Sequence, residues 1–441
     1  MPVAVLPSTA RLLLARTARA QRDGRAPSLV AGVVREGGLA WSAGRGDVPE
    51  PHADVQYRLG SISKTVTAVA VLRLRDEGRL HLDDPLDRHV PGTPLGDRTV
   101  GQLLAHVAGA AAESPGGWWE RTPGGSLADL ALSEEHVVLG AARRFHYSNL
   151  GFGLLGELVA RLRGRPWADV VRTEVLAPLG MTRTTPRPVA PAAEGRAVHP
   201  WADVVLPEPE HDAGVMAAAG QLWATLADLA RFAVFLLGDT GGVLAPATLA
   251  EMTVPAGVDP SVPGWSAYGL GLQVLRVDGR TLVGHGGSMP GFLAGVFVDR
   301  DERTGAVSLA NTTSGLDPLL PGLLADLRAA EPLVVEPWTP SPPPVPLECL
   351  GVWFWGPAPH VLRALPGGLL HLGPLPGRAG RASRFTPRDD GTWVGLDGYS
   401  AGEPLRIADD HLDLGTFVFT RTPYDPEAPV PGGVDERGWR P

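Results

Sequence analysis

A proline-rich segment from Glu331 to Pro346 constrains this chain more than any other feature of its sequence. Proline fixes φ and has no amide proton to donate, so such a run forms neither a helix interior nor a central strand and acts as a stiff spacer. The 441 residues are also more than one domain usually holds. We therefore expect two domains, residues 1–330 and 347–441, joined by a linker of residues 331–346.

The first domain mixes helical and strand patterns. Five segments have the apolar periodicity of helices: Ser8–Gln21 with Ser8 as its cap, Ser61–Asp76, Leu150–Arg163, Leu222–Leu237 and Leu316–Ala329. Strand patterns lie toward both ends of the domain, at residues 29–34, 39–42, 268–274, 281–284, 293–298 and 307–311. Helices in the middle with strands on either side predict an α+β fold.

The second domain has no helical periodicity. Short apolar runs alternate with three dipeptides that favour tight turns, at Gly367-Gly368, Asp390-Gly391 and Asp397-Gly398. Residues 416–420 form a strong strand pattern, and the tail after Pro423 reads as extended. The pattern predicts a small antiparallel β-barrel of about residues 347–422.

Composition limits the compartment and the partners. The net charge of -9 shows no basic excess, which argues against nucleic acid as a partner. No run of about 18 apolar residues predicts a membrane span, and the first residues lack the long apolar core of a signal peptide. Cys349 is the only cysteine, so the fold needs no disulfide. We expect a cytoplasmic protein.

Lys64 is the only lysine among 39 lysine and arginine residues. Arginine cannot lose its proton in a protein, whereas a desolvated lysine can, so this position is a candidate general base. Ser61 lies three residues earlier, on the same face of a helix and at its N-terminus, where N–H groups can face an oxyanion. The spacing favours Ser61 as a nucleophile with Lys64 as its base. The alternative is a capping serine beside a solvated lysine.

Ser61 and Lys64 form the first of three motifs, and the second is Tyr147-Ser148-Asn149, just before a predicted helix. Tyr147 could pass a proton between Ser61, Lys64 and a leaving group, or it could be a buried ring with a satisfied hydroxyl. Asn149 could hold a substrate amide carbonyl, or it could cap the helix that follows.

The third motif is Gly284-His285-Gly286-Gly287-Ser288, on a strand. Gly286 and Gly287 would let a substrate backbone approach closely. The N–H of Ser288 is a candidate second oxyanion donor. His285 could polarise or orient the acyl group, or it could be a structural histidine.

The three motifs together, in this order and spacing, resemble the penicillin-binding protein and class C β-lactamase superfamily of serine acyl-enzymes. The resemblance covers roughly residues 25–330 and extends to Gly78–Pro85, Leu103–His106, Pro178–Met181, Ala219–Trp223 and Gly269–Gly271. It implies an antiparallel sheet flanked by helices plus an all-helical region, with Ser61, Lys64 and Tyr147 as catalytic residues. His285-Gly286-Gly287 stands where β-lactamases and carboxypeptidases carry Lys-Thr-Gly. That departure is similar to the esterase, D-aminopeptidase and peptide-cyclase branches, and it argues against penicillin hydrolysis.

A lipocalin-like barrel after such a domain resembles the penicillin-binding-protein-type thioesterases of nonribosomal peptide assembly. The resemblance implies release of a peptidyl thioester by head-to-tail macrolactamisation with a D-residue at the acyl position, and a carrier protein that holds the peptide is a candidate partner. A cytosolic hydrolase of small-molecule or peptide substrates, an esterase or a D-aminopeptidase, is the alternative, and a non-catalytic binding module is the third.

A few other residues are weaker candidates. Trp118 and Trp119 could wall the substrate cleft, and Arg421 could reach a substrate from the barrel. The spacing of the histidine and aspartate residues fits no metal site, and we expect neither a metal nor a cofactor.

Overall fold

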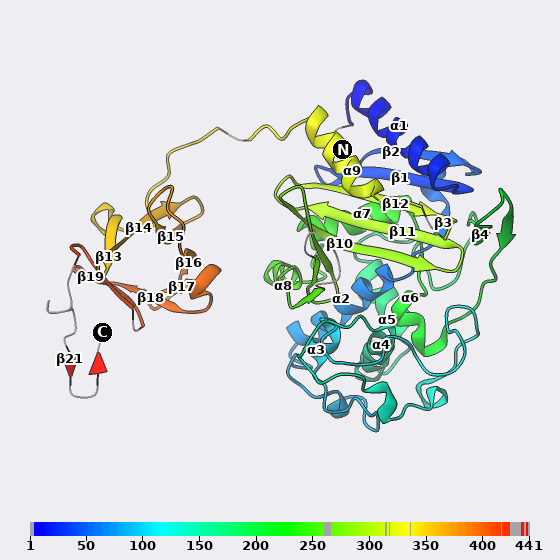
Figure 1. The fold of residues 1–441 in the computed structure, drawn as a ribbon, viewed down its shortest axis with the longest axis horizontal. Helices are drawn as coiled ribbons and strands as arrows, with labels where there is room; N and C mark the ends of the chain where they lie inside the picture. Colours follow the sequence, from blue (N-terminus) through cyan, green and yellow to red (C-terminus); the bar gives the residue numbers. More distant parts are fainter. Residues whose placement is uncertain are drawn as a thin grey trace. The chain divides into compact units, whose positions relative to one another are not determined.

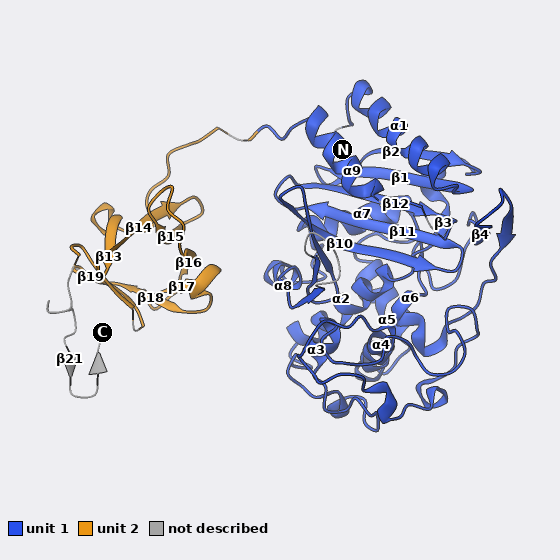
Figure 2. Cartoon of the chain, in the orientation of Figure 1, with its two compact units in different colours: residues 1–334 blue, residues 335–441 orange. Residues whose placement is uncertain are grey.

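The computed structural model describes residues 4–259, 266–313, 315, 316, 318–335, 337–415 and 417–423, together with the backbone of residues 434, 435, 438 and 439. The chain forms two compact units, residues 1–334 and 335–441 (Figure 2). Each unit contains hydrophobic core residues of its own. Among the described residues, every helix is too short or too polar to cross a bilayer.

An eight-stranded antiparallel sheet forms the centre of the first unit (Figure 1). Its strand order is β2 (Gly38–Gly46), β1 (Ser28–Arg35), β12 (Thr304–Ala310), β11 (Phe292–Asp299), β10 (Arg280–Met289), β9 (Gln273–Val277), β8 (Ser266–Tyr268) and β7 (Gly257–Asp259). Strand β1 pairs with β12, so that Leu29 lies opposite Ala310 and Arg35 opposite Thr304. Strands from near the two ends of the unit's sequence therefore lie side by side, as the second and third strands of one sheet.

Helices cover both faces of this sheet because successive side chains of a strand point to opposite faces. In β1, Leu29, Ala31 and Val33 pack with α1 (Pro7–Asp23) and α9 (Leu319–Ala330). Val30 and Val34 of the same strand belong to the larger core on the other face, which includes α2 (Ile62–Asp76) and α7 (Leu226–Leu237). The α2 helix is buried on nearly all sides, as expected for a central helix.

The remaining elements of the first unit are short, apart from one long helix, and most belong to a helical region on the α2 side of the sheet (Figure 1). The helices are α3 (Val100–Leu104), α4 (Asn149–Arg163), α5 (Trp167–Val171), α6 (Ala217–Gly220) and α8 (Pro246–Met252). Two small antiparallel pairs join β3 (Gln56–Arg58) with β6 (Trp223–Thr225) and β4 (Arg196–Val198) with β5 (Val205–Pro207).

The second unit is a closed eight-stranded antiparallel barrel, which confirms the predicted fold. Its strands are β13 (Gly351–Trp355), β14 (Ala358–Leu365), β15 (Leu369–Pro374), β16 (Ser383–Pro387), β17 (Trp393–Gly395), β18 (Pro404–Ile407), β19 (His411–Leu414) and β20 (Phe417–Thr420). Phe354 of β13 pairs with Thr420 of β20 and closes the ring. The three predicted tight turns lie in connections between consecutive strands.

Several predicted boundaries were wrong. The first helix begins at Pro7 after Leu6, and Ser8 is not its cap. The stretch before Leu226 is strand β6, which pairs with β3, and Thr225 caps α7 by accepting a hydrogen bond from the N–H of Asp228. The predicted strand of residues 268–274 is two strands, with Gly271 at φ +80° between them. Most of the predicted extended tail lies outside the described residues.

Candidate active site

The N-terminus of α2 is held against strand β10 by two glycines. The residues between strand β3 and α2 are positioned by a hydrogen bond, in which the Leu59 N–H donates to the Leu222 carbonyl at 2.7 Å. At Gly60 the backbone takes φ +56°, and a Cβ there would lie 2.5 Å from the Ser288 nitrogen. A Cβ on Gly287 would lie 1.9 Å from the Leu59 oxygen. Only glycine at both positions permits this approach, and it places Ser61 beside Ser288.

The Lys64 side chain reaches back one turn to Ser61. Its Nζ lies 2.9 Å from Ser61 Oγ and donates to the Ala219 carbonyl at 2.8 Å. The lysine is fully buried, and burial lowers its pKa to about 7. A neutral amine with one hydrogen on Ala219 can present its lone pair to the Ser61 hydroxyl. The alternative of a solvated lysine is wrong.

Tyr147 lies next to both groups. The Lys64 Nζ is 5.0 Å from the centre of its ring, and its hydroxyl contacts the Ser61 side chain. Burial raises the pKa of Tyr147 above its usual value, and the contact with Ser61 opposes that rise. Tyr147 is therefore a neutral phenol that can donate a proton. The buried ring of His106 packs on it with centroids 4.2 Å apart.

Strand β10 offers an unpaired edge beside Ser61. The β9–β10 ladder ends at Gly284, and the Gly286 N–H donates instead to the side chain of Gln273 on β9, at 3.0 Å. Alternate N–H groups of a strand point to the same edge. The Ser288 N–H therefore points to that edge as well, where no strand among the described residues pairs with it and where the start of α2 lies. The predicted role of the Ser61 and Ser288 N–H groups as oxyanion donors fits this arrangement and stays a prediction.

His285 is satisfied by protein partners on both sides of its ring. Its Nδ1 contacts the carbonyl of Gly286, and its Nε2 lies 2.8 Å from the hydroxyl of buried Tyr268. Burial lowers the pKa of His285 to about 3, so the ring is neutral. With Nδ1–H donating to the carbonyl, Nε2 accepts from the tyrosine hydroxyl. These contacts fit the structural alternative, and a contact with the acyl group stays a prediction.

A cavity of about 660 Å³ opens at the nucleophile. Six of the predicted residues line it: Ser61, Tyr147, His285, Gly286, Gly287 and Ser288. It continues over β11 toward the start of α9, where Phe297, Leu316 and Leu320 contribute apolar walls. Residues from three distant parts of the sequence therefore line one cavity, which is large enough for a small ligand.

Asn149, Trp118 and Trp119 do not line this cavity. The Asn149 amide donates to both carboxylate oxygens of Glu113, at 2.8 and 2.9 Å. Asn149 does not cap α4, because that cap is Ser148, whose Oγ accepts from the N–H of Gly151. The predicted contact of Asn149 with a substrate carbonyl stays a prediction.

The two tryptophans differ in exposure. Trp119 is 6% exposed and belongs to the core, and its Nε1 donates to Glu113 at 2.6 Å. Trp118 is 58% exposed, and its Nε1 donates to Glu120 at 2.8 Å. Each indole thus orients one carboxylate.

Arg421 is engaged within the barrel unit. Its guanidinium lies 3.6 Å from the centre of the Trp353 ring and donates to the carbonyls of Glu348, Leu350 and Val352. These contacts hold the last strand to the first. The predicted contact of Arg421 with a substrate stays a prediction.

Glu113 and Glu120 belong to none of the three sequence motifs. The charges of both carboxylates act on Lys64 and Tyr147, and burial raises the pKa of Glu120. The only signal was their place in the same loop as the two tryptophans. His106 also had no assigned role, although it lay in a segment that carried the resemblance.

No group of three or more His, Cys, Asp or Glu side chains in the described part of the chain could hold a metal ion. His211 contacts the carbonyl of Trp119 through Nε2 at 3.0 Å.

Comparisons with known proteins agree on the first unit. Residues 14–330 match the family model described as Beta-lactamase, and residues 342–421 match one described as Domain of unknown function (DUF7586). A human beta-lactamase-like protein is 29% identical over 350 residues, which are 73% of this chain and 68% of that protein. A D-stereospecific amidohydrolase from Streptomyces sp. is 26% identical, with a TM-score of 0.62, over 73% of this chain and 98% of that one. An octameric penicillin-binding protein homologue from Pyrococcus abyssi has a TM-score of 0.65 at 20% identity, over 94% of this chain and 99% of that one, which is a likeness of fold.

Proposed function

This chain belongs to the beta-lactamase family of serine hydrolases. From that premise we propose that it cleaves amides or esters of D-amino acids whose α-amine is free. The observation that carries this proposal is the pair of carboxylates, Glu113 and Glu120, whose charges act on the buried Lys64. The two carboxylates would hold the ammonium group of the donor.

In the acylation step, the Ser61 Oγ attacks the carbonyl carbon of the donor while its proton moves to the neutral Nζ of Lys64. The negative oxygen that develops is held by the N–H groups of Ser61 and Ser288. The tetrahedral adduct then collapses, the bond to the leaving amine or alcohol breaks, and the leaving group takes a proton from Tyr147. Tyr147 regains its proton from the Lys64 ammonium, which leaves an acyl-serine and a neutral lysine.

In the deacylation step, water attacks the acyl-serine carbonyl and gives its proton to Lys64 through Tyr147. Collapse of the second adduct returns that proton to Ser61 Oγ and releases the free acid. The fully buried position of Lys64 supports this cycle, because a base with a pKa near 7 is half deprotonated at neutral pH.

An ammonium bound at the carboxylate pair would also activate the base. Glu113 and Glu120 raise the pKa of Lys64, against the larger lowering by burial. A positive donor beside them would cancel that effect and lower the pKa of Lys64 further. A donor with a free amine would therefore favour its own cleavage. The D-configuration is supported by the similarity to the D-stereospecific amidohydrolase.

Macrolactamisation is a second candidate, because the same carboxylates could hold the N-terminal amine of a peptidyl thioester near the acyl-serine. Attack by that amine, after loss of its proton, forms the new amide and releases a ring from Ser61. Such a peptide could arrive on a carrier protein. The chemistry up to the acyl-enzyme is the same, and only the acceptor differs.

The test compares matched chromogenic anilides of D- and L-amino acids, each with a free and an acetylated amine. We expect turnover of the free D-donor, with a bound acyl group on Ser61 in intact-protein mass spectra and none in Ser61→Ala. A linear peptidyl thioester with a D-residue at the acyl position decides the acceptor, because a cyclase product is one water lighter than the free acid. Equal rates for free and acetylated donors would overturn the role of the carboxylate pair, and the absence of any adduct would overturn the enzyme mechanism.

A further inference from the structure

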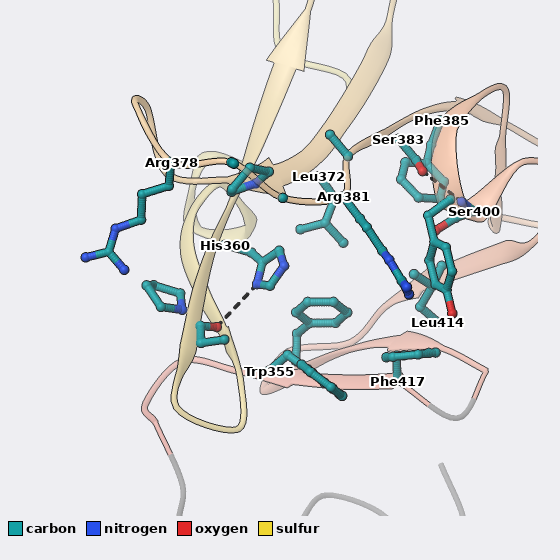
Figure 3. A pocket seen from close by; sticks show the side chains of 18 residues that line it. Trp355, His360, Leu372, Arg378, Arg381, Ser383, Phe385, Ser400, Leu414 and Phe417 are labelled. Atoms are coloured by element: carbon teal, nitrogen blue, oxygen red, sulfur yellow. Dashed lines mark hydrogen bonds between the residues drawn. The ribbon is translucent and has the colours of Figure 1, made fainter.

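The barrel of the second unit contains a cavity of about 500 Å³ at one end (Figure 3). In an antiparallel barrel with consecutive strands, connections alternate between the two ends. The cavity is lined by residues of the β15–β16 and β17–β18 connections and by residues near the ends of β13, β14, β19 and β20 that face the same end of the barrel. Arg421 and Trp353 do not line it, and Arg421 follows β20 at the other end.

The wall of this cavity is mostly apolar. Leu372 and Phe385 are buried in the barrel, while Trp355 is 46% exposed and Tyr399 is 54% exposed. Phe417 lies between these two rings, with centroids 5.4 Å from Trp355 and 6.0 Å from Tyr399. Exposed aromatic rings beside a hollow suit an apolar ligand better than water.

The Arg381 side chain places a positive charge beside this apolar wall. The Arg381 guanidinium lies 3.9 Å from the centre of the Tyr399 ring. Figure 3 shows Arg381 extending across the hollow, whereas Arg378 points away from it. Stacking occupies the face of a guanidinium and leaves its N–H groups, which lie in its plane, to bind an anion. No carboxylate among the described residues pairs with Arg381, and Asp397 pairs with Arg384 instead.

We propose that this cavity binds a small molecule with an apolar body and a carboxylate end, the body inside the barrel and the carboxylate on Arg381. A planar guanidinium matches a carboxylate with two parallel hydrogen bonds. The interior of an eight-stranded barrel can hold one small ligand. The proposal is independent of the chemistry at Ser61.

The experiment titrates the full chain with decanoate by calorimetry, and with decyltrimethylammonium, which has the same apolar body and the opposite charge. We expect one decanoate per chain and much weaker binding of the cation. Arg381→Gln should weaken decanoate binding about tenfold, the usual effect of losing a charged hydrogen bond. Arg381→Lys, which keeps the charge, should bind more tightly than Arg381→Gln.

Arg388→Gln is the matched control, because Arg388 is an exposed arginine in the β16–β17 connection at the opposite end of the barrel. We expect it to bind decanoate as the parent does. The proposal is overturned if the parent shows no saturable binding, if the cation binds as well as decanoate, or if Arg381→Gln and Arg388→Gln behave alike. If Arg381→Gln does not fold, the proposal is still tested by comparing the binding of decanoate and of decyltrimethylammonium to the parent and to Arg381→Lys.

Discussion

At the scale of single residues, the proposed chemistry depends on a lysine whose amine is buried. Lys64 keeps two partners, Ser61 and the Ala219 carbonyl, and burial brings its pKa to about 7. The other 38 of the 39 lysine and arginine residues are arginine. An arginine at position 64 would stay protonated and could not accept the proton of Ser61.

The pH dependence of kcat/KM follows from this lysine. Lys64 must be neutral to act, so activity should be low below its pKa, rise through pH of about 7 and then level off. Tyr147 adds no loss in that range, because burial raises its pKa above the usual value for tyrosine. The profile is measured with an acetylated chromogenic donor, so that no donor amine titrates in this range. A rate that falls between pH 6 and 8 would contradict the assignment of the base.

Replacement of the base gives the second prediction. Lys64→Arg should lower kcat by about 10²–10⁴, the usual contribution of a general base. Circular dichroism checks that the variant is folded. A folded Lys64→Arg protein with the parental rate would refute the mechanism.

The carboxylate pair gives the third prediction. Glu120→Gln removes a charge that raises the pKa of Lys64, so the acid limb of the pH profile should move to lower pH. The KM for donors with a free amine should rise, and the KM for acetylated donors should not. Glu135→Gln is the control, since Glu135 is exposed in the segment that follows the same loop. A purely structural role for Glu120 would change the KM of both kinds of donor together.

At the scale of elements, the site depends on how closely helix α2 meets strand β10. Gly60 and Gly287 interlock there, and each has backbone of the other segment where a Cβ would lie. Ser61 and Ser288 become neighbours through this contact. The proposed oxyanion site therefore needs both elements, because each supplies one of its two N–H groups.

Gly60→Ala tests this contact. The substitution should lower kcat by about 10²–10³, the usual effect of losing one oxyanion donor. It should also cost about 1–3 kcal/mol of stability, because alanine is strained at positive φ. Gly279→Ala is the matched control, since Gly279 has φ +77° and nothing within 4 Å of its Cβ position. Gly279→Ala should lose stability and keep its activity, and an equal loss of kcat in both variants would contradict the argument.

At the scale of the whole molecule, the core residues of the two units do not overlap. The residues that pack in the sheet-and-helix unit all precede residue 335, and those that pack in the barrel all follow it. A domain with its own core can fold by itself. We propose that the two units, with the proline-rich segment at their boundary, unfold independently.

A chain cut after Val334 tests that proposal. It should show one thermal transition fewer than the full chain and should still form the acyl-enzyme on Ser61 with a small donor. Calorimetry and intact-protein mass spectrometry provide the two measurements. A truncated chain that fails to fold, or a full chain with a single transition, would contradict independent units.

The sequence by itself determined what is local. The three-residue spacing of Ser61 and Lys64 brings their side chains together on a helix, and the turn dipeptides mark three of the connections between barrel strands. The family resemblance, the α+β unit, the barrel and membership of the serine hydrolases are confirmed. The roles of the individual site residues stay predictions.

The tertiary structure decided what is not local. Pairing with β3 made residues 223–225 a strand where their pattern favoured a helix, because strand partners distant in sequence override local propensity. Glu113 meets Asn149 across 36 residues, and Gly60 meets Ser288 across the whole unit. The apolar periodicity of the sequence does not predict such contacts, since they arise only when packing brings separate elements within a few ångströms of each other. The same packing removes water from Lys64, and that burial lowers its pKa to about 7, as the proposed base requires.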